Sequence, residues 1–125
     1  MKFNSEQELF DEVVRYAESM DRKAVDEHGN CKYRTPCGNK CLVGHLIEDD
    51  EYGSVMEQGI LNLGSSVSSL VERDLLPKHL VSHLDLLQRL QDAHDDASRE
   101  DFKLELVDNL KRVAKEHKLV YNGTL

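Results

Sequence analysis

The chain lacks tryptophan, has only two prolines, and contains no long run of apolar residues. Three phenylalanines and four tyrosines are its only aromatic side chains, so the core of this 125-residue chain has to be built mainly from leucine and valine. No apolar stretch approaches the roughly 20 residues that a membrane-spanning helix needs, and residues 1–8 lack the apolar centre of a secretory signal. We therefore expect a cytoplasmic protein without a membrane segment.

Cysteine is scarce, and its number is odd. Cys31, Cys37 and Cys41 are the only three. An odd set of thiols in a reducing compartment fits free thiols or metal ligands better than a disulfide framework. The sequence also has no Cys-x-x-Cys pair, no phosphate-binding glycine loop and no serine-centred nucleophile elbow. It therefore carries none of the common signatures of zinc ribbons, nucleotide-binding proteins or α/β-hydrolases.

Positive charge is also in short supply. The 24 acidic residues outnumber the 16 basic ones, which gives a formal net charge of −8 at pH 7. Such a charge disfavours broad, sequence-independent binding to nucleic acid, since each phosphate would meet a repulsive mean field. The length is that of one ordinary domain, and the chain shows no repeat or linker. We expect residues 1–125 to form a single domain.

Helical periodicity runs through most of the chain and predicts a mainly α fold with about four to six helices. Each expected helix has apolar residues at three- and four-residue intervals and a start or stop signal. In the first one, Ser5 and Glu8 have the spacing of a capping box, and the apolar face continues to Ala24, before the stop signal Gly29-Asn30. The expected elements are helices at 5–30 and 41–47, an acidic turn at 48–51, a short helix after Ser65 or Ser66, and helices at 77–95 and 98–117.

The segment 31–41 interrupts this helical pattern. Residues 32–34 alternate in polarity, residues 35–39 (Thr-Pro-Cys-Gly-Asn) have turn chemistry, and residues 40–41 can return as a second strand. We therefore predict a short β-hairpin or an ordered loop near residues 31–41, packed on the helices.

The same segment is where basic residues occur without acidic neighbours. Between positions 28 and 47 the charged residues are Lys32, Arg34 and Lys40. Together with Tyr33 they make the recognition surface that we expect for a small non-enzymatic binding module with an acidic or phosphate-bearing partner. Pairing with the acidic run at 48–51 would position the segment more than stabilise it, because exposed ion pairs contribute only about 0–1 kcal/mol each.

A zinc site is the first alternative for this segment. Cys31, Cys37, Cys41 and His45 supply four ligands of the types that zinc prefers, with His28 as a further candidate. Cys41 and His45 are four residues apart, so a helix would place them on one face. A zinc-stabilised nucleic-acid-binding module would follow. Structural zinc sites usually bring two close pairs of ligands, however, and this spacing does not. Without that zinc we expect no cofactor.

An enzyme of unknown reaction is the second alternative. His45 can activate Cys41 as a nucleophile, and His94 can line a polar cleft with Gln91 and Asp95. A histidine beside a stripe of leucines is more often a partly buried side chain that is satisfied by hydrogen bonds. The non-enzymatic interpretation is therefore favoured.

The run Cys31–Tyr52 resembles a signature of an uncharacterised family of short proteins from bacteriophages and bacteria. The shared pattern is C-x-Y-R-x-P-x-G-x-K-C-x-V-G-x-L-I-x-D-D-x-Y, and Leu84–Asp95 is similar to a later stretch of the same proteins. The resemblance covers most of the chain. It implies a small phage-associated protein, whose partner would be a host, defence or phage protein, but it implies no particular activity. It also implies that Cys37 and His45 need not be metal ligands.

Overall fold

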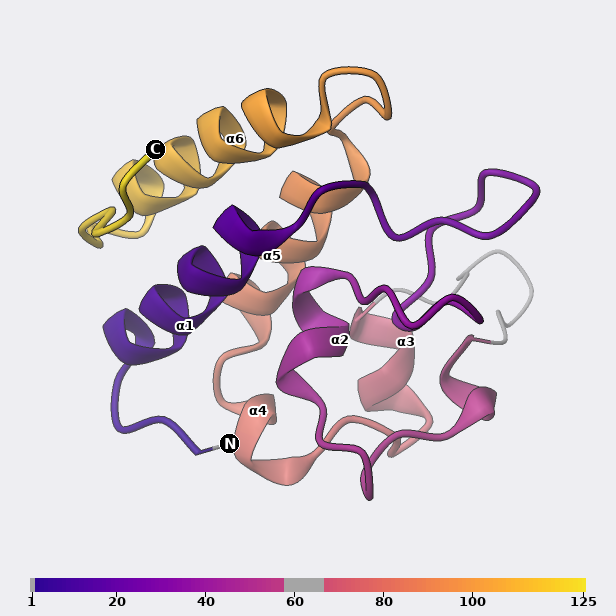
Figure 1. Cartoon of the computed structure of the whole chain (residues 1–125). Coiled ribbons are helices and arrows are strands. Elements are labelled where there is room, and N and C mark those ends of the chain that lie inside the picture. Colours follow the sequence, from indigo (N-terminus) through magenta and orange to yellow (C-terminus); the bar gives the residue numbers. More distant parts are fainter. Residues whose placement is uncertain (1, 58–66) are drawn as a thin grey trace.

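Short and medium-length helices account for the regular structure of the chain, and two longer ones, α1 and α6, lie side by side (Figure 1). The computed structural model describes residues 2–57 and 67–125. Within them the helices are α1 (Glu6–Ser19), α2 (Leu42–Leu46), the 3-10 turn η1 (Ser54–Glu57), α3 (Val67–Glu72), α4 (Lys78–Val81), α5 (Leu84–Asp95) and α6 (Phe102–Glu116). The prediction of a mainly helical single small domain with four to six helices is confirmed.

Helix α5 holds the core together. It contacts α2, α3 and α6, while α1 contacts α2 and α6. Leu86, Leu87 and Leu90 of α5 are fully buried, and the rest of the core is also rich in leucine and valine, as the lack of aromatic residues predicts. No helix in the described ranges is long and apolar enough to cross a membrane.

Helix α1 starts where the sequence predicts but ends earlier. The Ser5 hydroxyl accepts a hydrogen bond from the Glu8 backbone N–H at 3.2 Å, which confirms the N-cap. The helix ends at Ser19, so the predicted continuation toward Gly29 is wrong. Met20 and Ala24 continue the apolar pattern of the helix and are buried, but they belong to an extended segment that follows it. That segment is held by tertiary contacts instead of by helical hydrogen bonds. The pattern alone therefore predicts a helix that is too long.

The predicted helix at 77–95 is divided in two. Pro77 is the N-cap of α4 and not its first helical residue, and the chain turns at Ser82 and His83 before α5 begins. Neither glycine nor proline marks this break, so the sequence pattern does not reveal it. The predicted start of the last helix at Ser98 is too early, because α6 begins at Phe102 and its N-cap is Asp101. The Ser98 hydroxyl accepts from the Asp101 N–H and donates to Glu105 in the turn before the helix. The expected start at Ser65 or Ser66 lies outside the described residues.

The segment 31–41 is an ordered loop. Among the described residues only isolated bridges occur, between Val25 and Cys31 and between Arg34 and Lys40, so the β-hairpin alternative is wrong. A tight turn at 35–38, with Gly38 at positive φ, lies within the segment, and a second one, with Gly29 at positive φ, precedes it. The expected short helix and the acidic turn that follow are both present, as α2 and as a turn at 49–51.

Candidate functional site

The predicted recognition residues do not form one exposed face. Tyr33 is 2% exposed. Arg34 turns inward: one guanidinium nitrogen donates to Asp49 at 2.8 Å, another donates to the Ile47 carbonyl at 2.6 Å, and the group lies 4.6 Å above the Tyr52 ring. These two residues therefore hold the loop in place, and their side chains are not presented to a partner.

The two lysines of the predicted surface stay accessible. The Lys32 ammonium lies 3.9 Å from an Asp26 carboxylate oxygen, and the Lys40 ammonium lies 3.9 Å from Asp49. The side chains of Lys32 and Lys40 are 28% and 33% exposed. Partly exposed pairs at this distance are weak, so both cations can still meet an anionic group.

Glu57 fixes the conformation of the loop through hydrogen bonds, although nothing in the sequence pattern singles it out. Its carboxylate accepts hydrogen bonds from the backbone N–H groups of Tyr33 and Arg34, at 3.0 and 2.9 Å, and from the Tyr52 hydroxyl at 2.8 Å. Burial and the Glu57 carboxylate raise the pKa of Tyr52 to about 12. Glu57 comes from the irregular stretch after Gly53, where periodicity gives no information about which side chain points inward.

A cleft of about 770 Å³ opens beside this loop. Its size is in the range of ordinary ligand sites. The cleft brings together four parts of the chain: residues 22–27, the loop 32–39, Glu57 of η1 and the residue Arg99 before α6. Its basic lining residues are Arg22, Lys23, Lys32, Arg34 and Arg99.

Arg22 and Arg99 are the free cations of the cleft. Both are exposed, and neither guanidinium has a hydrogen-bond or ion-pair partner in the part of the chain that the structure describes. The Lys23 ammonium donates to the backbone carbonyls of Asp95 and Ala97, at 2.6 and 2.8 Å, and it forms no ion pair with the carboxylates of the described residues. Arg22 and Arg99 do not stand out in the sequence as one site, because most of the chain separates them.

Two of the three acidic residues that line the cleft already accept hydrogen bonds from the protein itself. Asp26 accepts hydrogen bonds from the backbone N–H groups of Asn30 and His28, which hold the pKa of its carboxyl below the usual range. Glu57 is taken up by the loop as described above. Among the acidic lining residues, Glu27 alone has no strong partner in the described part of the chain, and its carboxylate lies 3.5 Å from the His28 ring in an exposed pair. The cleft is therefore a locally basic site on an acidic protein.

Behind the cleft, a chain of hydrogen bonds joins α2, α5 and the extended segment after α1. The Cys41 thiol donates to the Gln91 side-chain oxygen at 3.2 Å and accepts from the Gly44 N–H at 3.3 Å. The Gln91 amide then donates to Asp95 at 3.1 Å. The predicted polar cleft around Gln91 is thus filled by the protein itself.

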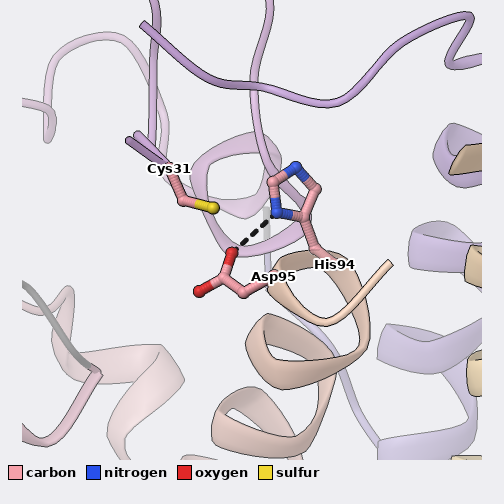
Figure 2. A group of neighbouring side chains, drawn as sticks. All are labelled: Cys31, His94 and Asp95. Carbon is pink, nitrogen blue, oxygen red and sulfur yellow. Dashed lines mark hydrogen bonds and ion pairs between the residues drawn. The ribbon is translucent and has the colours of Figure 1, made fainter. Parts of the chain in front are cut away.

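The second half of this network is centred on His94 (Figure 2). His94 is fully buried, its Nδ1 lies 2.8 Å from Asp95, and its Nε2 accepts the Ala24 N–H at 3.1 Å. Since Nε2 is an acceptor, a neutral ring must carry its proton on Nδ1 and donate it to Asp95. The Cys31 thiol, from the loop, also hydrogen-bonds to Asp95. The geometry therefore supports the interpretation of His94 as a buried side chain that is satisfied by hydrogen bonds.

The proposed Cys41–His45 pair is not formed. The His45 Nε2 lies 2.6 Å from Glu12, and its ring stacks on Tyr16 at 4.0 Å. Burial lowers the pKa of His45 despite the Glu12 carboxylate, which disfavours the charged ring, and its Nε2 is directed at Glu12 and not at a thiol. Cys41 bonds to Gln91 and Gly44 instead.

The predicted zinc ligands are also dispersed. Cys37 is exposed, Cys41 is fully buried, and neither joins a cluster of ligating groups formed by described residues. Within the described ranges the only such cluster is Cys31, His94 and Asp95, whose ligand atoms lie within 4.8 Å of one another. A metal there would need the Nδ1 lone pair, which would move the ring proton to Nε2 and point it at the Ala24 N–H. The cluster therefore does not fit a zinc ion in this arrangement.

The thiols give a prediction about reactivity. Burial, followed by the charge of Asp95, raises the pKa of Cys31 to about 11, and burial raises that of Cys41 to about 12, against an ordinary value of 9.0. Only thiolates are alkylated, so iodoacetamide at pH 8 should label Cys37 alone, as read by mass spectrometry of the intact chain and its peptides. Fast labelling of Cys31 or Cys41 in the folded protein would contradict these assignments.

The same pKa values fix the sign of a stability change at high pH. A thiol whose folded pKa is raised binds its proton more tightly in the folded state. Its contribution to the free energy of unfolding is present below pH 9 and is lost as the pH rises from about 9 through the folded values of about 11 for Cys31 and about 12 for Cys41.

Comparisons with family models, with known proteins and with solved structures find no match for this chain.

Proposed function

We propose that the protein is a small non-enzymatic binding module that recognises an acidic segment of a protein partner through the basic cleft. The observation that carries this proposal is the pair of unpartnered guanidiniums, Arg22 and Arg99, on the lining of a ligand-sized cleft. Arginine forks match carboxylates in bidentate geometry. Lys32 adds a third accessible cation. If the resemblance to short phage proteins holds, the partner is a host or phage protein.

The charge of the whole chain supports a short anionic segment over a long polyanion. A net charge of −8 repels an extended nucleic acid, whereas a few carboxylates can enter the local positive field of the cleft. The non-enzymatic part of the proposal is supported by the network behind the cleft. The raised pKa values of Cys31 and Cys41 keep these two thiols protonated at neutral pH, and both ring nitrogens of His94 are taken up by internal hydrogen bonds.

A charge-reversal experiment tests this function. The double variant Arg22→Glu/Arg99→Glu should bind a fluorescein-labelled octaglutamate peptide roughly tenfold more weakly than the unmodified chain, which is about 1.4 kcal/mol, because two attractive contacts become repulsive. Fluorescence anisotropy gives the dissociation constants, and the affinity of the unmodified chain should fall as salt is added.

Arg89→Glu/Arg112→Glu is the matched control. Both of its arginines are exposed and lie outside the cleft, and the pair changes the net charge by the same amount. This control should weaken binding much less than the cleft variant does. Equal losses in the two variants would show that only net charge matters, and no measurable binding to the unmodified chain would also reject the proposal.

A further inference from the structure

Away from the cleft, an extended segment after α6 occupies a specific site on α1. We name residues 119–125 the strap. The Gln7 side chain pairs with both backbone groups of Val120: its oxygen accepts the N–H at 2.9 Å, and its amide donates to the carbonyl at 2.8 Å. One turn further along α1, Asp11 accepts from the Asn122 side chain at 3.1 Å. The strap is thus recognised through its backbone as well as its side chains.

Glu18 binds the other end of the strap. Its carboxylate accepts from the backbone N–H groups of Thr124 and Leu125, at 2.8 and 2.9 Å, and from the hydroxyls of Tyr121 and Thr124. Gln7 and Glu18 are about 16 Å apart along the helix axis, which is about the length of five extended residues. Helix α1 and the strap therefore match in length as well as in hydrogen bonding.

The site is selective for the sequence of the strap. Tyr121 packs edge-on against Phe10 at 6.5 Å between ring centres, and the Lys111 ammonium lies 5.4 Å from the Tyr121 ring centre. A Cβ atom on Gly123 would lie 2.6 Å from the Tyr121 ring and closer still to a Glu18 oxygen. A tyrosine followed two residues later by glycine is what this surface accepts.

The strap reaches its site through one strained hinge. Lys118 has φ of 56°, a left-handed conformation that glycine usually adopts at this position after a helix. The Leu119 N–H closes the turn on the Ala114 carbonyl at 2.8 Å. The receiving residues Gln7, Asp11 and Glu18 all belong to α1, on the far side of this hinge. A strap from another copy can therefore make the same contacts, and strained hinges favour such exchange.

We propose that two copies of this chain exchange straps, so that the strap of each copy binds α1 of the other in a reciprocal dimer. The occupant is taken from the contacts above: the Tyr121 side chain meets both Glu18 and Phe10, and Gly123 leaves room for them, while Gln7 pairs with the backbone of Val120. The exchanged form removes the need for positive φ at Lys118. It competes with the closed monomer, which is favoured by the high effective concentration of a tethered strap.

Hinge variants of the full chain test the exchange by sedimentation velocity over a concentration series. Lys118→Val disfavours the left-handed conformation and should lower the dimer dissociation constant by roughly tenfold or more relative to the unmodified chain. Lys118→Gly relieves the strain in the monomer and should raise the constant. Adding Gly123→Ala to Lys118→Val should abolish the dimer, because the strap no longer fits either copy.

The position of the strap in the dimer provides an independent readout. In a dimer of Lys118→Val mixed from ¹⁵N-labelled and ¹³C-labelled copies, interchain nuclear Overhauser effects should join Gln7 of one copy to Val120 of the other. A monomeric Lys118→Val, or a dimer that survives Gly123→Ala, would overturn the proposal. If circular dichroism shows that Lys118→Val does not fold, the unmodified chain is compared with Lys118→Gly instead. Equal dimer dissociation constants for these two proteins would overturn the proposal.

Discussion

Replacing Gly44 with alanine is expected to lower the free energy of unfolding by about 3 kcal/mol or to prevent folding, at the upper end of the penalty for overpacking a core. An added Cβ atom would lie 2.8 Å from the carbonyl carbon of Tyr33 and 3.1 Å from its Cα, with the carbonyl oxygen closer still. These are backbone atoms, so no side chain can turn aside to make room.

The clash would separate α2 from the loop that packs against it. The Cys41 N–H donates to the same Tyr33 carbonyl at 3.2 Å, and the Gly44 N–H donates to the Cys41 thiol. Moving Tyr33 would in turn disturb its hydrogen bond to Glu57. The effect of one methyl group therefore spreads through the whole loop.

Urea denaturation followed by circular dichroism measures the change, and Gly53→Ala is the matched control. The Cβ atom added at Gly53 would have Val55 as its nearest neighbour at 3.8 Å, an ordinary contact. We expect the control to change the free energy of unfolding by less than about 1 kcal/mol. A Gly44→Ala protein as stable as the unmodified chain would show that α2 does not approach Tyr33 as described.

The second large effect is expected for His94→Ala, which should cost about 3 kcal/mol of stability. The substitution removes a fully buried ring that packs edge-on against Phe102 at 5.4 Å between ring centres. It also leaves the Ala24 N–H without its acceptor and Asp95 without its closest donor. Buried groups that lose a partner pay their full desolvation penalty, about 1–3 kcal/mol.

His83→Ala serves as the control for this prediction. His83 is half-buried at the start of α5, and its ring makes no hydrogen bond or ion pair within residues 2–57 and 67–125. Its loss should change the unfolding free energy by about 0.5 kcal/mol or less. Similar decreases in the unfolding free energy of the two variants would contradict the conclusion that the hydrogen bonds of His94, unlike the ring of His83, stabilise the fold.

The sequence predicts the parts of this fold that depend on local interactions. The Ser5 cap and the buried faces of α1, α5 and α6 follow from residues three and four positions apart. The end of α1 does not, because Ala24 leaves the helix to bond with His94, seventy positions away. Periodicity cannot distinguish a buried helical alanine from a buried extended one.

The candidate site was predictable only in part. The basic character of the 31–41 segment is visible in the sequence, and Lys32 lines the cleft. The inward turn of Arg34 was not foreseen, because its partners Asp49 and Ile47 depend on how α2 returns beneath the loop. Arg99 joins the site only through tertiary structure.

The buried network and the cleft are parts of one arrangement. Lys23 and Ala24 bond to the end of α5 at Asp95, Ala97 and His94. These bonds hold the segment after α1 against α5. Arg22 and Arg99, which line the same cleft, follow or precede the bonded residues by one or two positions. The network thus provides the framework on which the free guanidiniums are presented.

An NMR titration tests the binding role of this cleft most directly. Unlabelled octaglutamate peptide is added to the ¹⁵N-labelled protein, and the shifts of backbone amides and arginine Nε–H groups are followed. If the cleft binds the peptide, the perturbations should be concentrated at Arg22, Lys32 and Arg99, and α6 beyond its first turn should be unaffected. Perturbations spread over α1 and α6 with none at the two cleft arginines would contradict this binding role.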